Sequence, residues 1–194
     1  TLARPWALPG TPGLEHRIGG LEKADRTGDI SYDPNNHDTM VRLRQAKVDR
    51  ITRAIPPTVV DDPAVEDPAA ENPTAGTDGR AAGSARVLVL GWGSTRGVID
   101  AACHRVRRRG VPVAQVHLRH LNPFPPDLGE ILRGYDRVIL PEMNLGQLAM
   151  MLRARYLVDV EGINQVRGMP FRAAELEESI WELLHGSAAE RELH

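Results

Sequence analysis

The sequence predicts an α/β domain of the Rossmann-like type, in which a parallel sheet carries helices on both faces. Short apolar runs alternate with amphipathic segments four times between residues 86 and 185. A glycine-rich turn from Gly91 to Gly97 separates the first apolar run from the first amphipathic segment, which is typical of a strand followed by a helix. Alternation this tight requires right-handed crossovers, and these produce parallel strands covered on both faces.

The elements expected in this domain follow in order along the chain. The strands are expected at residues 87–90, 113–118, 137–140 and 157–160, and the helices at 95–109 and 126–133, after residue 144, and around 176–184. The first helix ends in consecutive arginines followed by Gly110, which suits the negative end of a helix dipole and a C-terminal cap. The third helix presents one apolar face, formed by Leu145, Leu148, Ala149, Leu152 and Tyr156.

The N-terminal third has a different composition. Residues 1–55 are polar and proline-rich, and we expect an irregular arm with one helix from Asp38 to Ile55, capped by Asp38. Residues 56–85 mix Pro, Ala, Gly and acidic residues, with almost nothing large to bury, and are expected to form a flexible acidic linker. The α/β domain then spans residues 86–185, and residues 186–194 form a tail.

Composition narrows the class of protein. The chain has 194 residues with 24 basic and 26 acidic side chains, a net charge of -2, which does not favour nucleic acid as a partner. One cysteine, Cys103, excludes an intrachain disulfide and a multi-cysteine metal site, and it suits a reducing cytoplasm. The apolar runs predict neither a membrane span nor a secretory signal. Because the chain starts at Thr1, we expect a fragment or a processed piece.

Polar, aromatic and glycine residues follow three of the predicted strands. In a parallel sheet the carboxyl ends of the strands meet at one edge, where ligands or partner chains dock. Asn144 with Glu142 is sufficient to cap the following helix, but Gly146 is a poor helix former, so we expect another backbone or a cofactor to approach closely there. The candidate cofactor-binding or interface residues are Trp92, Ser94, Arg119, Asn122, Glu142, Asn144 and Gln147.

Common catalytic patterns are missing. The turn reads Gly-x-Gly-x-x-x-Gly, and Arg119-His120 stand where NAD-binding folds have an acidic residue, which disfavours NAD and leaves NADP open. The histidines lack metal-ligand spacing, and Cys103 is expected to be a buried structural thiol. We therefore assign neither catalytic nor metal-binding residues. One alternative is a stand-alone module that binds NADP or a CoA-like phosphate ligand through Arg105–Arg109 and Arg119. A second alternative is a degenerate remnant that folds but has no activity.

Several motifs, taken together and in order, resemble the C-terminal part of the alpha subunit of 2-oxoacid:ferredoxin oxidoreductases, of the actinobacterial 2-oxoglutarate type. They are Gly13–His16, Gly19-Gly20, Asp33–His37, Arg44 with Lys47, Leu90–Thr95, Leu118–Pro125, Pro141–Leu148 and Gly168–Phe171. The resemblance implies that residues 86–185 form a transketolase C-terminal-like domain. It also implies that residues 1–55 are the tail and connector of a pyrimidine-binding domain.

The same resemblance implies an activity for the complete enzyme. The family oxidises and decarboxylates 2-oxoglutarate with coenzyme A to succinyl-CoA and passes the electrons to ferredoxin. Its thiamine diphosphate, magnesium and iron–sulfur cluster come mainly from a beta subunit, and its alpha subunit carries N-terminal domains with a Tyr-Pro-Ile-Thr-Pro motif that has no counterpart here. We therefore expect a structural and interface role for this chain, with the beta subunit and the N-terminal alpha portion as partners. By itself the chain is expected to bind no cofactor and to be inactive.

Overall fold

The chain divides into two compact units. The computed structural model describes residues 2–17, 19–63 and 86–185. The first unit consists of residues 1–56 with 122–124, and the second of residues 57–121 with 125–194. The division falls at the start of the predicted linker. Most of that linker, residues 64–85, and the predicted tail, residues 186–194, lie outside the described residues.

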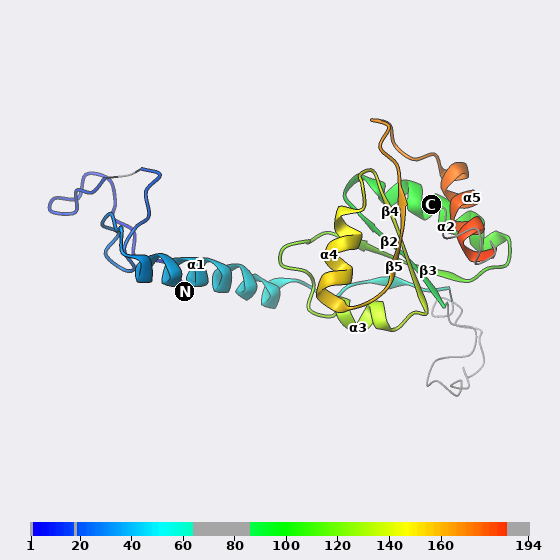
Figure 1. The fold of residues 1–194 in the computed structure, drawn as a ribbon, viewed down its shortest axis with the longest axis horizontal. Coiled ribbons are helices and arrows are strands. Elements are labelled where there is room, and N and C mark those ends of the chain that lie inside the picture. The colour runs from blue at the N-terminus through cyan, green and yellow to red at the C-terminus, as the bar shows by residue number, and fades with distance from the viewer. Residues whose placement is uncertain (1, 18, 64–85, 186–194) are drawn as a thin grey trace. The chain divides into compact units, whose positions relative to one another are not determined.

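The first unit contains one long helix preceded by an irregular arm. Within the described part of the arm, Lys23 and Ile30 form an isolated antiparallel β-bridge. Helix α1 then runs from Pro34 to Ile51 (Figure 1). The predicted N-cap at Asp38 is wrong. Asp33 caps the helix instead, because its carboxylate accepts from the Asn35 N–H and because Pro34 fits the first helical position. The α-helix also ends before the predicted Ile55, since a 3-10 turn follows at Thr52–Ala54.

The second unit is built on a five-stranded sheet, and the predicted α/β fold is confirmed. Its strands are β1 (Val60–Asp61), β2 (Val87–Trp92), β3 (Val113–Leu118), β4 (Arg137–Glu142) and β5 (Val160–Asn164). They lie in the order β1-β3-β2-β4-β5, and all neighbours are parallel except β1 and β3. Its helices are α2 (Arg96–Arg108), α3 (Leu128–Arg133), α4 (Gln147–Tyr156) and α5 (Ala173–His185), with a 3-10 turn at Gly93–Thr95 before α2.

Strand β1 corrects the linker prediction. Residues 57–63 were expected to be flexible, but Val60 pairs with Val116 and Asp61 with Gln115 in an antiparallel ladder. Side chains hold this edge strand in place: the Arg107 guanidinium donates to the Asp61 carboxylate at 3.1 Å and to its carbonyl oxygen at 3.0 Å. Two residues are too short for a periodicity to be visible in the sequence, and tertiary contacts specify the strand.

The observed bounds of most of the other strands differ from the predicted ones at the strand ends. Strand β3 spans the predicted residues, and β2 and β4 each extend two residues beyond the prediction. The fourth strand was predicted at 157–160 but lies at 160–164, because Leu157 adopts a left-handed conformation (φ 54°) at the end of α4 and interrupts the chain there. Leu145, expected on the buried face of α4, precedes the helix and is 85% exposed.

Helices cover both faces of the sheet. In Figure 1, α2 and α5 lie together on one side of the strands, and α3 and α4 lie on the other. Val87 and Val89 pack with Ile99, Cys103 and Leu176 under α2 and α5. Leu88 and Leu90 alternate to the opposite face, so the central strand is buried on both sides. That face is completed by fully buried leucines of the other two helices, including Leu128, Leu132 and Leu152.

The glycines of the first turn have different roles. Gly93 turns the chain with φ 61°, as expected. Gly91 is needed for close packing, because a Cβ atom there would lie 2.6 Å from Ile99 Cδ1 and 3.1 Å from His117 Nδ1. Gly97 has neither a positive φ nor any heavy atom within 4 Å of a Cβ position, so it is an ordinary helical residue.

We expect Gly91→Ala to lower the free energy of unfolding by about 1–3 kcal/mol, because buried Ile99 has little room to move away. The matched variant Gly97→Ala is expected to raise it by up to about 1 kcal/mol, since alanine is the better helix former. Urea unfolding of the full chain followed by circular dichroism measures both. Equal effects of the two substitutions would contradict this assignment.

Candidate functional site at the carboxyl edge of the sheet

The strand order reverses next to β2, and the sheet separates there. Helix α2 leads from β2 to β3 on one side, whereas α4 leads from β4 to β5 on the other. Pairing between β2 and β4 covers only residues 87–89 with 137–139, although β2 pairs with β3 as far as Trp92 and β4 pairs with β5 as far as Glu142. Open α/β sheets bind ligands at such a switch point, beyond the carboxyl ends of the strands.

The turn after β2 is fixed by a threonine that the sequence analysis did not single out. The Thr95 hydroxyl donates to the Trp92 carbonyl at 2.8 Å and accepts from the Trp92 N–H at 3.2 Å. Trp92 is half-buried, and its Nε1 is buried without a hydrogen-bond partner within the described part of the chain. Ser94 lies at the tip of the turn and is exposed. Of the two predicted site residues in this turn, Ser94 is therefore the accessible one.

His117 lies beneath the same turn. It was expected to be a surface or packing histidine, and the structure places it in packing: it faces Gly91 across the β2–β3 ladder, and its Nδ1 is buried without a hydrogen-bond partner among the described residues. Burial, and next the positive charge of Arg96, lowers the pKa of His117 below its ordinary value, so the ring is neutral at pH 7. The sequence signal for it was a histidine inside a strand that is apolar apart from Gln115.

Glu142 and Asn144 are used to start α4. The Glu142 carboxylate is completely buried and accepts from the Leu148 and Ala149 N–H groups, each at 3.0 Å, and from Asn144 Nδ2 at 3.1 Å. Asn144 Oδ1 in turn accepts from the N–H groups of Gly146 and Gln147. The predicted capping role of both residues therefore explains their contacts.

Gly146 is explained without a close ligand. Its φ of 85° lies in the left-handed region that favours glycine, and a Cβ there would lie 3.3 Å from the Asn164 side chain. The expectation that another backbone or a cofactor approaches this glycine is therefore replaced by a conformational requirement within the chain. Gln147, the first residue of α4, is exposed and remains a candidate contact residue.

The loop after β3 supplies the remaining predicted residues. Arg119 follows the last residue of β3 and is exposed. Asn122 is exposed as well, but residues 122–124 group with the first unit, so the edge is built without Asn122. The second unit thus brings Ser94, Arg119 and Gln147 to the carboxyl edge as exposed polar side chains, at the ends of three different strands.

The arginine cluster considered for phosphate binding lies at the other end of the strands. Arg105, Arg108 and Arg109, together with Glu177, line a pocket of about 390 Å³ where α2 ends and β3 is about to begin. Glu177 lies 3.6 Å from Arg105 and 3.5 Å from Arg109. A carboxylate that already pairs with two of the three arginines disfavours an anionic ligand there.

The other contacts of the cluster are also within the chain. Arg109 pairs with Glu178 at 2.8 Å, and its guanidinium lies 3.6 Å from the centre of the Trp181 ring. Arg107 is bound by Asp61. The positive charges at the C-terminal end of α2 are therefore balanced mainly by carboxylates of α5.

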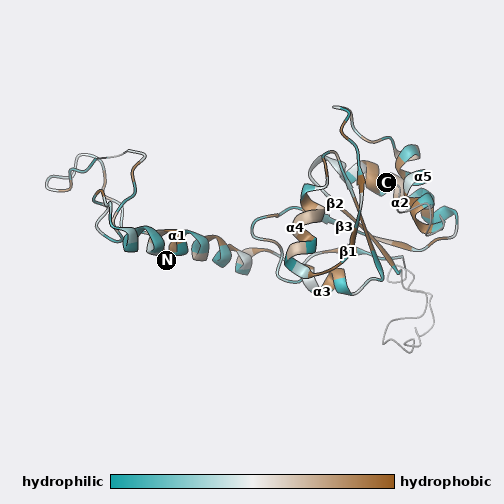
Figure 2. Ribbon diagram, in the orientation of Figure 1, coloured by the Kyte–Doolittle hydropathy of each residue, from teal (hydrophilic) through white to brown (hydrophobic). Residues whose placement is uncertain are grey.

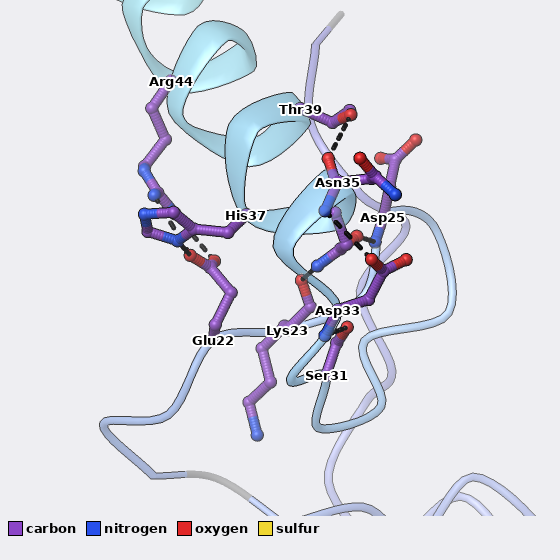
Figure 3. Close-up of polar contacts among 10 residues, drawn as sticks. Glu22, Lys23, Asp25, Ser31, Asp33, Asn35, His37, Thr39 and Arg44 are labelled. Atoms are coloured by element: carbon purple, nitrogen blue, oxygen red, sulfur yellow. Dashed lines mark hydrogen bonds and ion pairs between the residues drawn. The ribbon is translucent and has the colours of Figure 1, made fainter.

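In the first unit, the motif residues join the arm to α1. The Glu22 carboxylate accepts from Arg44 Nη1 at 3.0 Å and contacts His37 Nδ1 at 2.8 Å (Figure 3). The hydrogen bond from Arg44, and next that from His37, lowers the pKa of Glu22 from 4.5 to about 2. Nearby, Asn36 donates to the Lys23 carbonyl and accepts from the Asp25 N–H. This polar network fixes the end of the arm on the first turns of α1.

The described residues do not fit the metal centres of the implied family. They hold no group of three or more His, Cys, Asp or Glu side chains that could bind a metal ion. Burial raises the pKa of the Cys103 thiol to about 12, which opposes the thiolate that an iron–sulfur cluster requires. We therefore derive no cofactor step from this chain.

Comparison with known proteins gives the same family as the motifs. The family described as pyruvate:ferredoxin oxidoreductase core domain II matches residues 85–178. The 2-oxoglutarate oxidoreductase subunit KorA of Mycobacterium tuberculosis is 54% identical over 192 residues, which is 99% of this chain and 26% of that protein. The chain is therefore similar, over almost its whole length, to a subunit of a 2-oxoacid oxidoreductase. It spans about a quarter of the length of that relative.

Two further relatives extend the comparison. The alpha subunit of 2-oxoacid:ferredoxin oxidoreductase 2 from Aeropyrum pernix is 36% identical over 103 residues, 52% of this chain and 16% of that protein. The solved 2-oxoglutarate:ferredoxin oxidoreductase of Magnetococcus marinus, with 2-oxoglutarate, coenzyme A and succinyl-CoA bound, superposes with a TM-score of 0.70 and 29% identity. That match covers 92% of this chain and 28% of that chain. Among the described residues, no helix is both long and apolar enough to cross a membrane.

Removing the Glu142 carboxylate is expected to destabilise the second unit more than removing the Asn144 amide. Glu142→Ala leaves two buried N–H groups without an acceptor, so we expect a loss of about 2–4 kcal/mol in the free energy of unfolding. Asn144→Ala affects more exposed N–H groups, and a loss of about 1 kcal/mol is expected. Chemical denaturation of the two variants tests this, and a smaller loss for Glu142→Ala would refute the capping assignment.

Because the pKa of Glu22 is low, the stability of the first unit is expected to depend on pH in the acidic range. Because the folded-state pKa is below the ordinary value, the contribution of Glu22 to stability is present above pH 4.5 and is lost as pH falls towards about 2. Arg44→Gln should raise the Glu22 titration midpoint, measured by carboxyl NMR of the full chain. The matched variant Arg42→Gln, which removes the partner of Asp38, should raise the Asp38 pKa and leave Glu22 unchanged. A Glu22 midpoint that does not respond to Arg44→Gln would exclude this ion pair as the cause.

Proposed function

We propose that the chain is the part of an alpha subunit that supports assembly of a thiamine-diphosphate-dependent 2-oxoglutarate:ferredoxin oxidoreductase. The identity of 54% to the M. tuberculosis 2-oxoglutarate oxidoreductase subunit over 99% of the chain carries this proposal. In the reaction, 2-oxoglutarate and coenzyme A yield succinyl-CoA and carbon dioxide, and two electrons pass to ferredoxin. The substrate and acylated product bound in the M. marinus enzyme support the choice of 2-oxoglutarate.

The chain contributes surfaces to this enzyme rather than reacting groups. We assign thiamine diphosphate, magnesium and the iron–sulfur cluster to the complete complex, mainly to its beta subunit, and coenzyme A to it as co-substrate. Ser94, Arg119 and Gln147 are the exposed side chains of the carboxyl edge, and we assign them to contact with the beta subunit or the N-terminal alpha portion. Glu142 and Asn144 act indirectly, because they hold the start of α4. A cytoplasmic location follows from this role.

The test is reconstitution from separate polypeptides. This chain, a beta subunit and the N-terminal portion of an alpha subunit are co-purified and assayed for ferredoxin reduction that depends on both 2-oxoglutarate and coenzyme A. A complex that turns over supports the proposal, and the chain alone is expected to show neither turnover nor calorimetric binding of NADP. Failure of the folded chain to associate, or saturable NADP binding, would overturn it.

Within the complex, the edge can be tested by substitution. Gln147→Ala and Arg119→Ala remove exposed side chains and should leave the stability of the isolated chain within about 0.5 kcal/mol. If these residues contact a partner, we expect the double variant to weaken assembly or turnover by about tenfold. The matched double variant His104→Ala, Arg108→Ala removes exposed side chains of α2, outside the carboxyl edge, and should have no such effect. Unchanged assembly and turnover in the edge variant would exclude the carboxyl edge as a contact surface.

A further inference from the structure

The sulfur-containing side chains differ widely in their access to solvent. All five methionines and the single cysteine lie within the described part of the chain, so all of them can be compared. Cys103 is completely buried, and Met40 is 6% exposed. The four accessible methionines are Met150 (64% exposed), Met169 (58%), Met151 (51%) and Met143 (37%). A dissolved oxidant therefore reaches thioethers and not the thiol.

The Cys103 thiol is also chemically unreactive. Peroxides attack the thiolate form of cysteine, and burial raises the pKa of Cys103 to about 12, so the thiolate is nearly absent at neutral pH. A methionine thioether has no proton to lose. Its oxidation is limited by access rather than by ionisation, which again favours the exposed methionines.

Two of the accessible methionines are neighbours on α4. Leu148, Ala149 and Leu152 face the sheet and are buried. At 100° per residue, Met150 and Met151 lie away from this buried side. Figure 2 colours much of α4 white to brown, so the helix is largely apolar although part of it faces water. Oxygen added to the two thioethers would make this exposed side polar.

We propose that Met150 and Met151 form a reversible oxidation site, at which hydrogen peroxide converts the two thioethers to sulfoxides. In each reaction the sulfur donates an electron pair to one peroxide oxygen and an S–O bond forms. The O–O bond breaks, and the other oxygen leaves as water with both hydrogens of the peroxide. The sulfur loses two electrons and the peroxide gains them. This proposal does not depend on the proposed function.

The fold tolerates oxygen on these two side chains. A sulfoxide disrupts a core because it is polar, but Met150 and Met151 face water. The start of α4 is held from its inner side, where the Glu142 carboxylate accepts from the Leu148 and Ala149 N–H groups. The sulfoxides also remain accessible to the reductases that restore methionine. Oxidation at α4 therefore changes the surface of the second unit and leaves its core intact.

The test is a time course of the full chain in hydrogen peroxide, followed by peptide mass spectrometry. Met150 and Met151 should each gain one oxygen at least about tenfold faster than Met40, which reacts only when its surroundings open. The far-UV circular dichroism should not change, and Cys103 should still react with an alkylating agent after denaturation. Oxidation of Met40 or Cys103 before the α4 pair would overturn the proposal.

Leucine variants identify the groups that react. Met150→Leu with Met151→Leu keeps the apolar volume, so the chain should fold, and the rapid uptake of oxygen should fall by one atom for each thioether removed. The matched variant Met40→Leu should leave the rapid uptake unchanged. Met169 lies in the loop between β5 and α5, and it should react in all of these variants. Rapid uptake that is not lowered in the double variant would contradict the assignment.

Reversibility has a readout of its own. Methionine sulfoxide reductases of both stereospecificities, supplied with dithiothreitol, should return the oxidised chain to its starting mass. Free methionine sulfoxide in the same reaction is the control for reductase activity. Sulfoxides at Met150 and Met151 that persist while the free sulfoxide is reduced would overturn the reversible site.

Discussion

The second unit depends on the position of β2 as the central strand. Its first four residues are buried on both faces, and it pairs with β3 on one side and with β4 on the other. Since the chain leaves β2 towards β3 and later returns to the far side of β2 as β4, the two crossovers pass over opposite faces of the sheet. The separation of the strands at their carboxyl ends, and hence the candidate site, follows from this topology and not from any one side chain.

Local structure uses many of the polar groups at that edge. Thr95 supports the turn after β2, and Glu142 and Asn144 start α4. Buried polar groups must be paired, so these side chains have little capacity left for a ligand. What the edge offers to another molecule is Ser94, Arg119 and Gln147, which suits contact and positioning better than catalysis.

The sequence predicted the α/β class, the strand at 113–118 and the glycine that follows α2, because hydrophobic periodicity and glycine positions report local structure directly. The sequence analysis placed the N-cap of α1 at Asp38 instead of Asp33, since the first turn of α1 is exposed and has no apolar periodicity. It missed β1, which long-range contacts to Arg107 hold in place. It also attributed Gly146 to a close ligand, because one sequence does not distinguish a glycine needed for a positive φ from one needed for space. The residues that gather at the carboxyl edge were predictable from topology, but their division into buried and exposed groups required the structure.

The distribution of charge separates the surfaces of the second unit by role. Arg105 and Arg109 at the end of α2 pair with carboxylates of α5, and Arg107 pairs with Asp61 of β1, all within the same chain. At the end of α4, Arg153 lies 3.9 Å from Asp159 and donates to the Val160 carbonyl, so its charge is also used within the chain. Basic residues at the ends of both helices therefore serve the fold, and the exposed polar side chains of the carboxyl edge are left for contact with another molecule.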